Sequence, residues 1–265
     1  MAPIDITDPA DSRVADFRGL NDASYRRRVE TGGPFGGGFF VVEGWLAFER
    51  ALAARHEIRS VLVLRHKIER ALELLGGREP PVFVVAPEVC EQIVGFDLHR
   101  GIVASVSRRR PANPDTLVAR SERLLVVEGV NDAENLGAIF RSAAALGADG
   151  VLLDPTTADP LSRRAVRVSV GHVLGLPWAR GSLAGRLDRH ATVALTPALD
   201  AVDLREVDFG DRPVAILVGA EGPGLSAQAR ALAELAVRIP MSRGVDSLNV
   251  AAAASVAMWH LFRTD

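Results

Sequence analysis

Apolar and polar positions alternate in blocks along most of the chain. Between residues 39 and 106, short apolar, β-branched runs are followed by longer amphipathic stretches. Short apolar runs bounded by turn residues predict strands, whereas amphipathic stretches of roughly ten residues predict helices. This alternation predicts a small α/β domain. We expect strands at residues 39–44, 58–64, 81–85 and 99–106, and helices at residues 45–55, 67–75 and 87–94.

A second alternation of the same kind begins at Arg123 and continues to the last helix pattern. Buried-type strands that are each followed by a helix predict a parallel sheet with helices on both faces. The ligands of such sheets bind beyond the carboxyl ends of the strands. We expect strands at residues 123–128, 150–153, 176–179, 191–195, 213–218 and 237–239, and helices at residues 135–147, 161–169, 182–189, 225–234 and 247–262.

The stretch between the two regions, residues 107–115, contains two prolines and three arginines and interrupts both patterns. Such composition is typical of a linker. The first 38 residues are polar, have little periodicity and end in a glycine-rich run, so we expect a flexible lead-in with one short helix near residues 23–30. The predicted parts are a lead-in at 1–38, an α/β domain at 39–107, a linker at 108–119 and a second α/β domain at 120–265.

Composition places the chain among globular proteins. Of its 265 residues, 48% are hydrophobic and 24% are charged, which are ordinary globular values. No apolar run reaches the roughly 18 residues of a membrane span, and the acidic start does not resemble a signal peptide. A single cysteine, Cys90, excludes an internal disulfide and a cysteine-rich zinc site. No histidine pair has metal-ligand spacing, so we expect a protein without a metal. The missing membrane span, signal peptide and disulfide lead us to expect a cytoplasmic protein.

Almost all basic residues are arginines, and several of them lie in clusters along the chain. The net charge is −2, and every basic residue except Lys67 is an arginine. Arginines cluster at residues 26–28, 108–110 and 163–167. A guanidinium fork pairs with two phosphate oxygens at once, so these clusters are candidate nucleic-acid contacts. A solvated surface produces the same pattern, and charge alone does not separate the two interpretations.

Three polar turns follow strands of the second region. The first turn enters the helix that begins near Asn135, the second is the glycine-rich stretch 219–224, and the third, residues 240–249, enters the last helix with Asp246 or Ser247 as its expected N-cap. A glycine-rich turn is also an ordinary connector between a strand and a helix. No dinucleotide-binding glycine fingerprint, phosphate-binding P-loop or nucleophile elbow occurs.

Taken together and in this order, the three turns resemble the motifs of the SpoU (TrmH) family of RNA ribose 2′-O-methyltransferases, in the SPOUT superfamily. The resemblance covers about residues 120–265, and its motifs are specific as a set. Residues 39–106 resemble, more weakly, the small RNA-binding domain that often precedes the catalytic one and is similar to ribosomal protein L30e. The matching residues are Asn135, Gly137 and Arg141, then Leu217–Leu225, then Ile239–Met241 with Ser247–Val250.

The resemblance implies a fold and a cofactor that the spacing alone does not show. The carboxyl-terminal segment would thread a loop to form a trefoil knot, an exception among protein chains. S-adenosylmethionine would lie in the knot. The family works as a homodimer through the knotted domain, with Arg141 reaching towards the site of the partner copy. The residues implied to bind the cofactor are Thr196, Gly219, Glu221, Ile239, Met241 and Leu248.

The implied reaction is methyl transfer to a ribose 2′-hydroxyl of RNA, with Arg141, Asn249, Asn135, Glu221 and Ser247 as catalytic candidates. The family's proposed base is the residue at Arg141. A guanidinium stays charged at neutral pH, so Arg141 could instead anchor a phosphate and acidify the hydroxyl electrostatically. Asn249 would orient the ribose or Arg141, while Ser247 and Glu221 would shape the pocket.

The RNA is less well specified than the reaction. Arg108, Arg109 and Arg110 are the candidate RNA contacts, together with Arg100, which stands where many relatives carry glutamine. An accessory domain before the catalytic one favours rRNA, and tRNA is the alternative. A non-catalytic RNA-binding or assembly protein on the same fold is the second hypothesis. A third hypothesis is an α/β enzyme that acts on a small molecule, but the sequence offers no catalytic constellation for it beyond the three turns.

Overall fold

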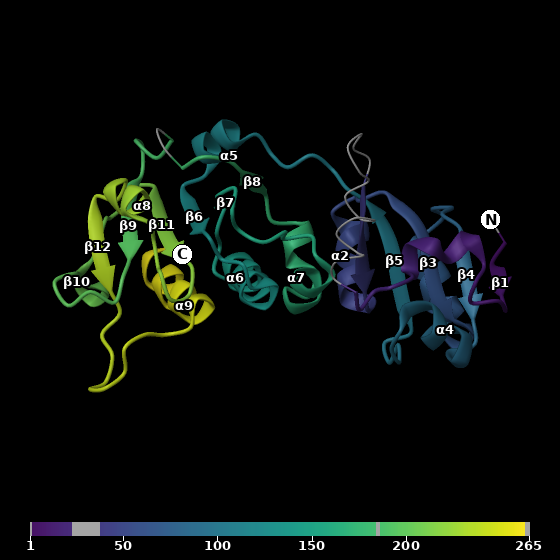
Figure 1. Ribbon diagram of the computed structural model, residues 1–265. Helices are drawn as coiled ribbons and strands as arrows, with labels where there is room; N and C mark the ends of the chain where they lie inside the picture. The colour runs from purple at the N-terminus through teal and green to yellow at the C-terminus, as the bar shows by residue number, and fades with distance from the viewer. Residues whose placement is uncertain (1, 23–37, 184–185, 263–265) are drawn as a thin grey trace. The chain divides into compact units, whose positions relative to one another are not determined.

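The computed structural model describes residues 2–22, 38–183 and 186–262 (Figure 1). The chain forms two compact units. The first unit comprises residues 1–109 and 161–175, and the second comprises residues 110–160 and 176–265. Within the described ranges, no helix is long and apolar enough to cross a membrane.

The first unit is built on a mixed five-stranded sheet with the strand order β1-β4-β3-β5-β2. Strands β1, β4 and β3 are parallel, and β5 runs antiparallel to both β3 and β2. All four strands expected in this region are present. One, at residues 58–64, has the expected ends, and the other three differ by one to three residues at an end. The strands are β1 (Ile4–Ile6), β2 (Phe39–Glu43), β3 (Ile58–Leu64), β4 (Val82–Val85) and β5 (Ile102–Ser107).

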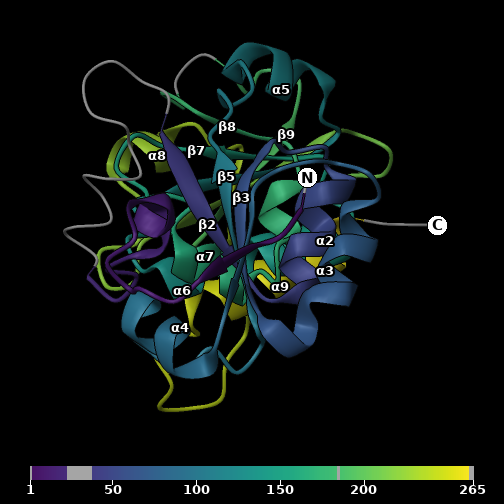
Figure 2. The same cartoon turned by 90° about the vertical axis from the view of Figure 1, so that its right-hand side faces the viewer.

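Helices cover both faces of this sheet. Figure 2 shows α2 and α3 on one side of the strands and α4 on the other. Successive strand residues point to opposite faces, so an entirely buried strand needs apolar residues throughout. Strand β4 meets this condition, because all of its residues are apolar and buried. The structure confirms the three helices that the sequence predicts here. They are α2 (Trp45–Ala53), α3 (Ile68–Leu75) and α4 (Pro87–Val94).

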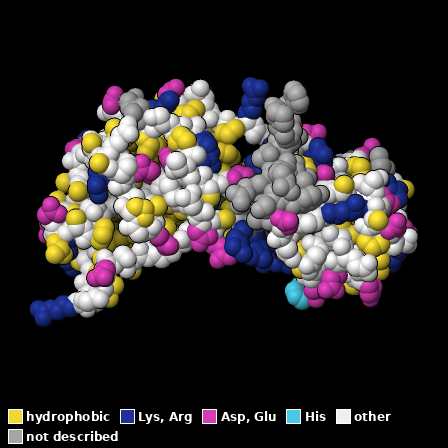
Figure 3. Space-filling view, in the orientation of Figure 1, with side chains coloured by type: hydrophobic (Ala, Val, Ile, Leu, Met, Phe, Trp, Pro, Cys, Tyr) yellow, Lys and Arg dark blue, Asp and Glu magenta, His cyan; other side chains and the backbone are white. Residues whose placement is uncertain are grey.

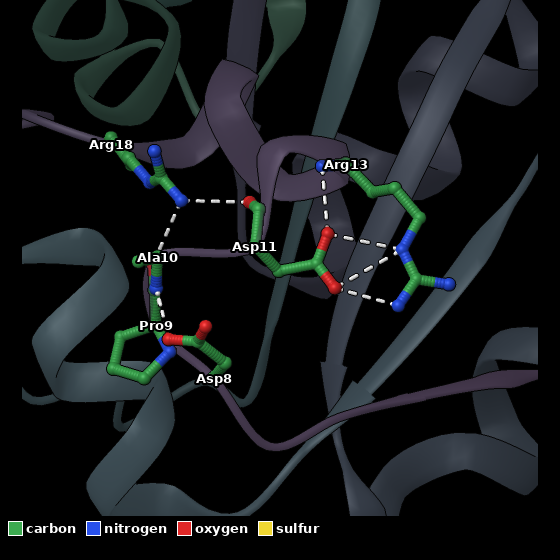
Figure 4. Close-up of polar contacts among 6 residues, drawn as sticks. All are labelled: Asp8, Pro9, Ala10, Asp11, Arg13 and Arg18. Atoms are coloured by element: carbon green, nitrogen blue, oxygen red, sulfur yellow. Dashed lines mark hydrogen bonds and ion pairs between the residues drawn. The ribbon is translucent and has the colours of Figure 1, made fainter.

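The expectation of a flexible lead-in is wrong for its first part. Strand β1 pairs with β4, and a 3-10 helix, η1 (Ser12–Phe17), buries Val14 and Phe17 in the core. Figure 4 shows how polar contacts fix this segment: Asp11 accepts hydrogen bonds from the backbone and guanidinium of Arg13. Its buried apolar residues are one in a three-residue strand and then Val14, Phe17 and Leu20, and a run of three such positions is too short to predict an element. The helix expected near residues 23–30 lies outside the described residues.

The second unit contains a seven-stranded sheet in the order β10-β12-β9-β11-β6-β7-β8, and every pairing is parallel. This confirms the α/β class and the parallel sheet. The strands are β6 (Arg123–Glu128), β7 (Gly150–Leu153), β8 (Trp178–Arg180), β9 (Ala191–Leu195), β10 (Val202–Asp203), β11 (Val214–Gly219) and β12 (Leu235–Arg238).

Helices lie on both faces of the second sheet. In Figure 1, α5 and α8 lie on one side of the strands, and α6 and α9 on the other. Between the sheet and the first pair, Leu117, Leu124 and Ala229 belong to one buried apolar cluster. The helices are α5 (Pro114–Arg120), α6 (Ala133–Ala145), α8 (Ala227–Ala231) and α9 (Val250–Leu261).

Two sequence-based assignments in this unit differ from the structure. Helix α5 occupies part of the expected linker, where Asn113 caps it and Pro114 takes the first helical position. The helix expected at 182–189 is wrong, because its described residues form no helix. Leu183 and Leu187 are both buried in the core. Their four-residue spacing imitates a helical face, although the chain reaches the core there in an irregular conformation.

A third difference concerns residues 161–175, which pack with the first unit although the sequence placed them in the second. This segment contains α7 (Arg163–Val168) and the 3-10 helix η4 (His172–Leu174). Arg163 forms an ion pair with Glu43 at 2.7 Å, and both side chains are largely buried. Gly171 permits close packing, because an added Cβ would lie 2.8 Å from the Cα of Ala47.

His190 gives the second unit a testable pH response. It is 4% exposed, its Nε2 lies 2.8 Å from the Ser121 carbonyl oxygen, and its Nδ1 has no partner among the described residues. Burial lowers the pKa of His190 below its ordinary value. The unfolded chain, with an ordinary histidine pKa of about 6.5, therefore binds a proton that the folded chain resists.

Stability should consequently fall as the pH drops below about 6.5, by at most about 1.4 kcal/mol per pH unit for one proton. In His190→Gln, the decrease in melting temperature between about pH 7 and pH 5.5 should be smaller than in the wild type. The exposed His66 provides the control, since His66→Gln should keep the wild-type decrease. An equal decrease in melting temperature with pH in all three proteins would contradict the assignment of this pH response to His190.

Candidate active site

The turns that follow β9, β11 and β12 meet at one edge of the second sheet. Strand β9 lies between β11 and β12, and parallel strands end at the same edge. A cavity of about 410 Å³ lies among these turns. Its lining includes all six residues implied to bind the cofactor, Thr196, Gly219, Glu221, Ile239, Met241 and Leu248, and two further catalytic candidates, Ser247 and Asn249.

The glycine-rich turn after β11 folds back on itself. A Cβ added to Gly219 would lie 2.2 Å from the carbonyl carbon of Gly224, so no other residue fits there. Gly222 and Gly224 have positive φ, a conformation that side-chain-bearing residues rarely adopt. The turn therefore exposes backbone groups at the cavity wall and holds Glu221 at its mouth.

The side chain of Asn249 joins all three polar turns. Its Nδ2 donates to Asn135 Oδ1 at 2.7 Å and to Glu221 Oε1 at 2.8 Å. Its Oδ1 accepts from the backbone N–H groups of Ala251 and Ala252. Asn249 is thus the N-cap of α9, and the sequence-based assignment of Asp246 or Ser247 to that position is wrong. Asparagine satisfies the helix N–H groups as well as aspartate or serine does, and its side-chain amide has two N–H donors for further partners.

Arg141 does not join this arrangement within one chain. It lies on α6, is exposed, does not line the cavity, and makes no side-chain hydrogen bond or ion pair with any described residue. Helix α6 packs against α9, where the hydroxyl groups of Ser142 and Ser255 lie 2.8 Å apart. Gly137 is buried in α6.

The candidate RNA contacts lie outside the cavity. In the first unit, Arg108 donates to the Phe39 carbonyl, and Arg109 donates to the Ala54 carbonyl. Arg100 lies over Gly44, where an added Cβ would be 2.6 Å from its Cδ. Arg110 is exposed and belongs to the second unit. Part of this cluster therefore has a structural role.

Most of the cavity wall that the sequence did not single out is apolar. Leu195 and Val237 come from strands β9 and β12, and Ala253 comes from the first turn of α9. Such residues look like ordinary core positions in a sequence, so no signal separates them. Glu221 is the one ionisable residue among those lining the cavity, which therefore carries a formal charge of −1. No cluster of three metal-ligating side chains occurs among the described residues.

Comparison with known proteins identifies the family. The sequence profile of the SpoU rRNA methylase family matches residues 122–259. The chain belongs to the SpoU methylase family. A second profile, described as RNA 2′-O ribose methyltransferase substrate binding, matches residues 41–112.

Relatives of this SpoU protein span almost its whole length. An uncharacterized tRNA/rRNA methyltransferase of Mycobacterium tuberculosis is 40% identical over 268 aligned residues, which cover 98% of this chain and 92% of the relative. The crystal structure of an AdoMet-bound rRNA methyltransferase from Sinorhizobium meliloti has a TM-score of 0.80 at 27% identity, covering 97% of this chain and 96% of that one. A solved RNA 2′-O ribose methyltransferase has a TM-score of 0.73 at 29% identity, covering 97% of each chain. The SpoU protein is therefore an RNA methyltransferase.

Two substitutions of Asn249 separate its capping role from its bridging role. Asn249→Ala removes both, and loss of the cap alone costs about 1 kcal/mol. Asn249→Asp keeps an oxygen that caps α9 but places a carboxylate where an N–H now meets Glu221 at 2.8 Å. Like charges at this distance repel, so Asn249→Asp should be less stable than the wild type at neutral pH.

Carboxyl groups protonate near pH 4, so the stability deficit of Asn249→Asp should shrink on acidification. The deficit of Asn249→Ala should change little. Urea unfolding of the three proteins at about pH 7 and pH 4.5 measures both. Equal pH responses of the two variants would show that Asn249 acts only as a cap.

Proposed function

We propose that this SpoU protein transfers a methyl group from S-adenosylmethionine to a ribose 2′-hydroxyl of RNA, with rRNA as the substrate. The observation that carries the proposal is the meeting of the second and third motifs at one cavity, where Asn249 donates hydrogen bonds to Glu221 of the second motif and to Asn135 of the first. The solved 2′-O ribose methyltransferase and the AdoMet-bound rRNA methyltransferase, both similar over the whole chain, support the reaction and the donor. The trefoil knot implied by the family resemblance is part of this proposal.

The cavity fits the donor in size and chemistry. Its volume of about 410 Å³ lies within the range of roughly 300–1,000 Å³ for small-molecule sites. Apolar wall residues suit an adenine ring, and backbone groups beside Thr196, Gly219 and Met241 suit its polar edges. The carboxylate of Glu221 suits a cationic ligand. The bound donor would supply a methyl group on a positively charged sulfonium sulfur.

The side chains around the cavity position the acceptor and help to remove its proton. Transfer to a hydroxyl requires alignment with the methyl group and loss of the hydroxyl proton. The hydrogen bonds of Asn249 to Asn135 and Glu221 hold these polar groups in fixed orientations before the acceptor arrives. Ser247, at the cavity wall, makes no side-chain hydrogen bond with any described residue, which leaves its hydroxyl for a ribose or donor oxygen. Such preorganisation lowers the cost of reaching the reactive geometry.

Arg141 completes the site from a second copy of the chain. Its absence from the cavity of its own chain and its exposure on α6 support this role. Val256 and Trp259 of α9, the helix packed against α6, are 41% and 74% exposed. An exposed apolar surface of this kind favours association of two copies. The charged guanidinium would anchor a phosphate and stabilise the developing alkoxide.

The choice of rRNA can be tested with purified protein. Deproteinised rRNA should accept radioactive methyl groups from S-adenosylmethionine, whereas tRNA should accept few. A 2′-O-methyl group blocks alkaline cleavage of the next phosphodiester, so the label should appear in alkali-resistant dinucleotides. Label in single nucleotides would place the methyl group on a base. Preferential labelling of tRNA would instead support the alternative substrate.

The role of Arg141 can be tested by complementation. Arg141→Ala should abolish methyl transfer while leaving donor affinity within a few fold, because Arg141 does not line the cavity. Mixing Arg141→Ala with Asn249→Ala should restore activity. Half of randomly mixed dimers pair the two variants, and each has one complete site, so about a quarter of wild-type activity is expected. No recovery after subunit exchange would show that Arg141 acts within its own chain or only in folding.

A further inference from the structure

A second cavity, of about 740 Å³, adjoins the first one in the same unit. It lies among the turn after β9, the glycine-rich turn and the segment between β12 and α9. Figure 1 shows that segment leaving the sheet and returning to α9. Thr196, Gly222, Ile239 and Met241 line both cavities, so ligands in the two would be neighbours.

The two cavities differ in charge. Arg230 of α8, Arg238 of β12 and Arg243 of the third polar turn line the second cavity, together with Asp246. The lining therefore has a formal charge of +2, against −1 for the first cavity. Figure 3 shows a basic side chain projecting at the tip of the segment between β12 and α9.

Two of these arginines are available for a ligand. Arg238 donates through Nε to the Ala201 carbonyl at 3.2 Å, so it is partly committed to the fold. Arg230 and Arg243 are exposed and form no ion pair or side-chain hydrogen bond with any described residue. Elsewhere in this unit Arg205 and Arg212 are paired with Asp203 and Glu234. Unpaired arginines lining a cavity suit an oxyanion.

We propose that the second cavity binds phosphate groups of the RNA next to the target ribose. This proposal rests on RNA being the acceptor. Guanidinium forks match phosphate oxygens. Leu199 and Val245, which line the same cavity, are 91% and 51% exposed, and they offer apolar surface to an unstacked base. A positive cavity beside a negative one separates the cationic donor from the anionic chain of the acceptor.

The test measures the salt dependence of RNA binding by the full-length protein. The probe is a single-stranded oligouridylate of about ten nucleotides, a length typical of single-strand binding sites. Each phosphate neutralised contributes about 0.7 to the slope of log affinity against log salt for single strands. Arg230→Ala and Arg243→Ala should each lower the slope by about 0.7, and the double variant by about 1.4. Arg243→Lys should keep the wild-type slope, because its charge remains.

Arg120→Ala is the matched control, because Arg120 is exposed on α5 and lines neither cavity. It should leave the slope of the wild type unchanged. Unchanged melting temperatures would show that all variants fold. Donor affinity, measured by calorimetry, should stay within about twofold in every variant, since the donor occupies the other cavity.

Three results would overturn the proposal. One is an unchanged slope in the double variant, and another is a wild type that does not bind the probe at low salt. The third is a loss of donor affinity of tenfold or more at an unchanged slope, because the arginines would then hold the carboxylate of the donor. If the slope depends on the arginines but no RNA is methylated, the proposed function fails and the phosphate site stands. If RNA is methylated but the slope is unaffected, only the phosphate site fails.

Discussion

The amide group of Asn249 is the contact on which the arrangement of the site depends. An asparagine side chain has two N–H donors and one oxygen acceptor. Here both donors meet oxygens from two other turns, and the oxygen accepts from the start of α9. Aspartate would lack the donors, and serine would reach fewer partners. One residue therefore fixes a helix end and the arrangement of the candidate catalytic residues together, and neither can shift without the other.

This contact is possible because of the order of the strands. Turns that lie far apart in the sequence meet because β9 lies between β11 and β12, and β6 pairs with β11 on its other side. All of these strands are parallel, so every turn that enters the site leaves from the same edge. Gly219 and the positive-φ glycines after it then allow one turn to fold back closely enough to face the other two.

Much of this site was predictable from the sequence, and the failures have physical causes. Turn residues with special backbone requirements, such as the glycines at 219, 222 and 224, leave a strong signal. The N-cap of α9 was misplaced because three neighbouring residues all have capping side chains, and only the fold shows which one faces the helix. The ordered start of the chain was missed because a three-residue strand and a run of three buried apolar positions are too short to predict an element from local pattern. Residues 161–175 were assigned to the wrong unit because local pattern does not encode which core a helix joins.

The proposed division of labour between copies rests on the same geometry. One chain builds the proposed donor cavity, since the turns that line it are joined within that chain. The same chain leaves Arg141 exposed on α6, a helix that packs against α9, which carries the exposed Trp259. On the proposed mechanism, donor binding needs one copy, whereas proton removal needs two. Methyl-transfer activity would then depend on protein concentration in the range where dimers dissociate, because it requires two copies to associate. Donor binding would not depend on protein concentration, because one copy suffices.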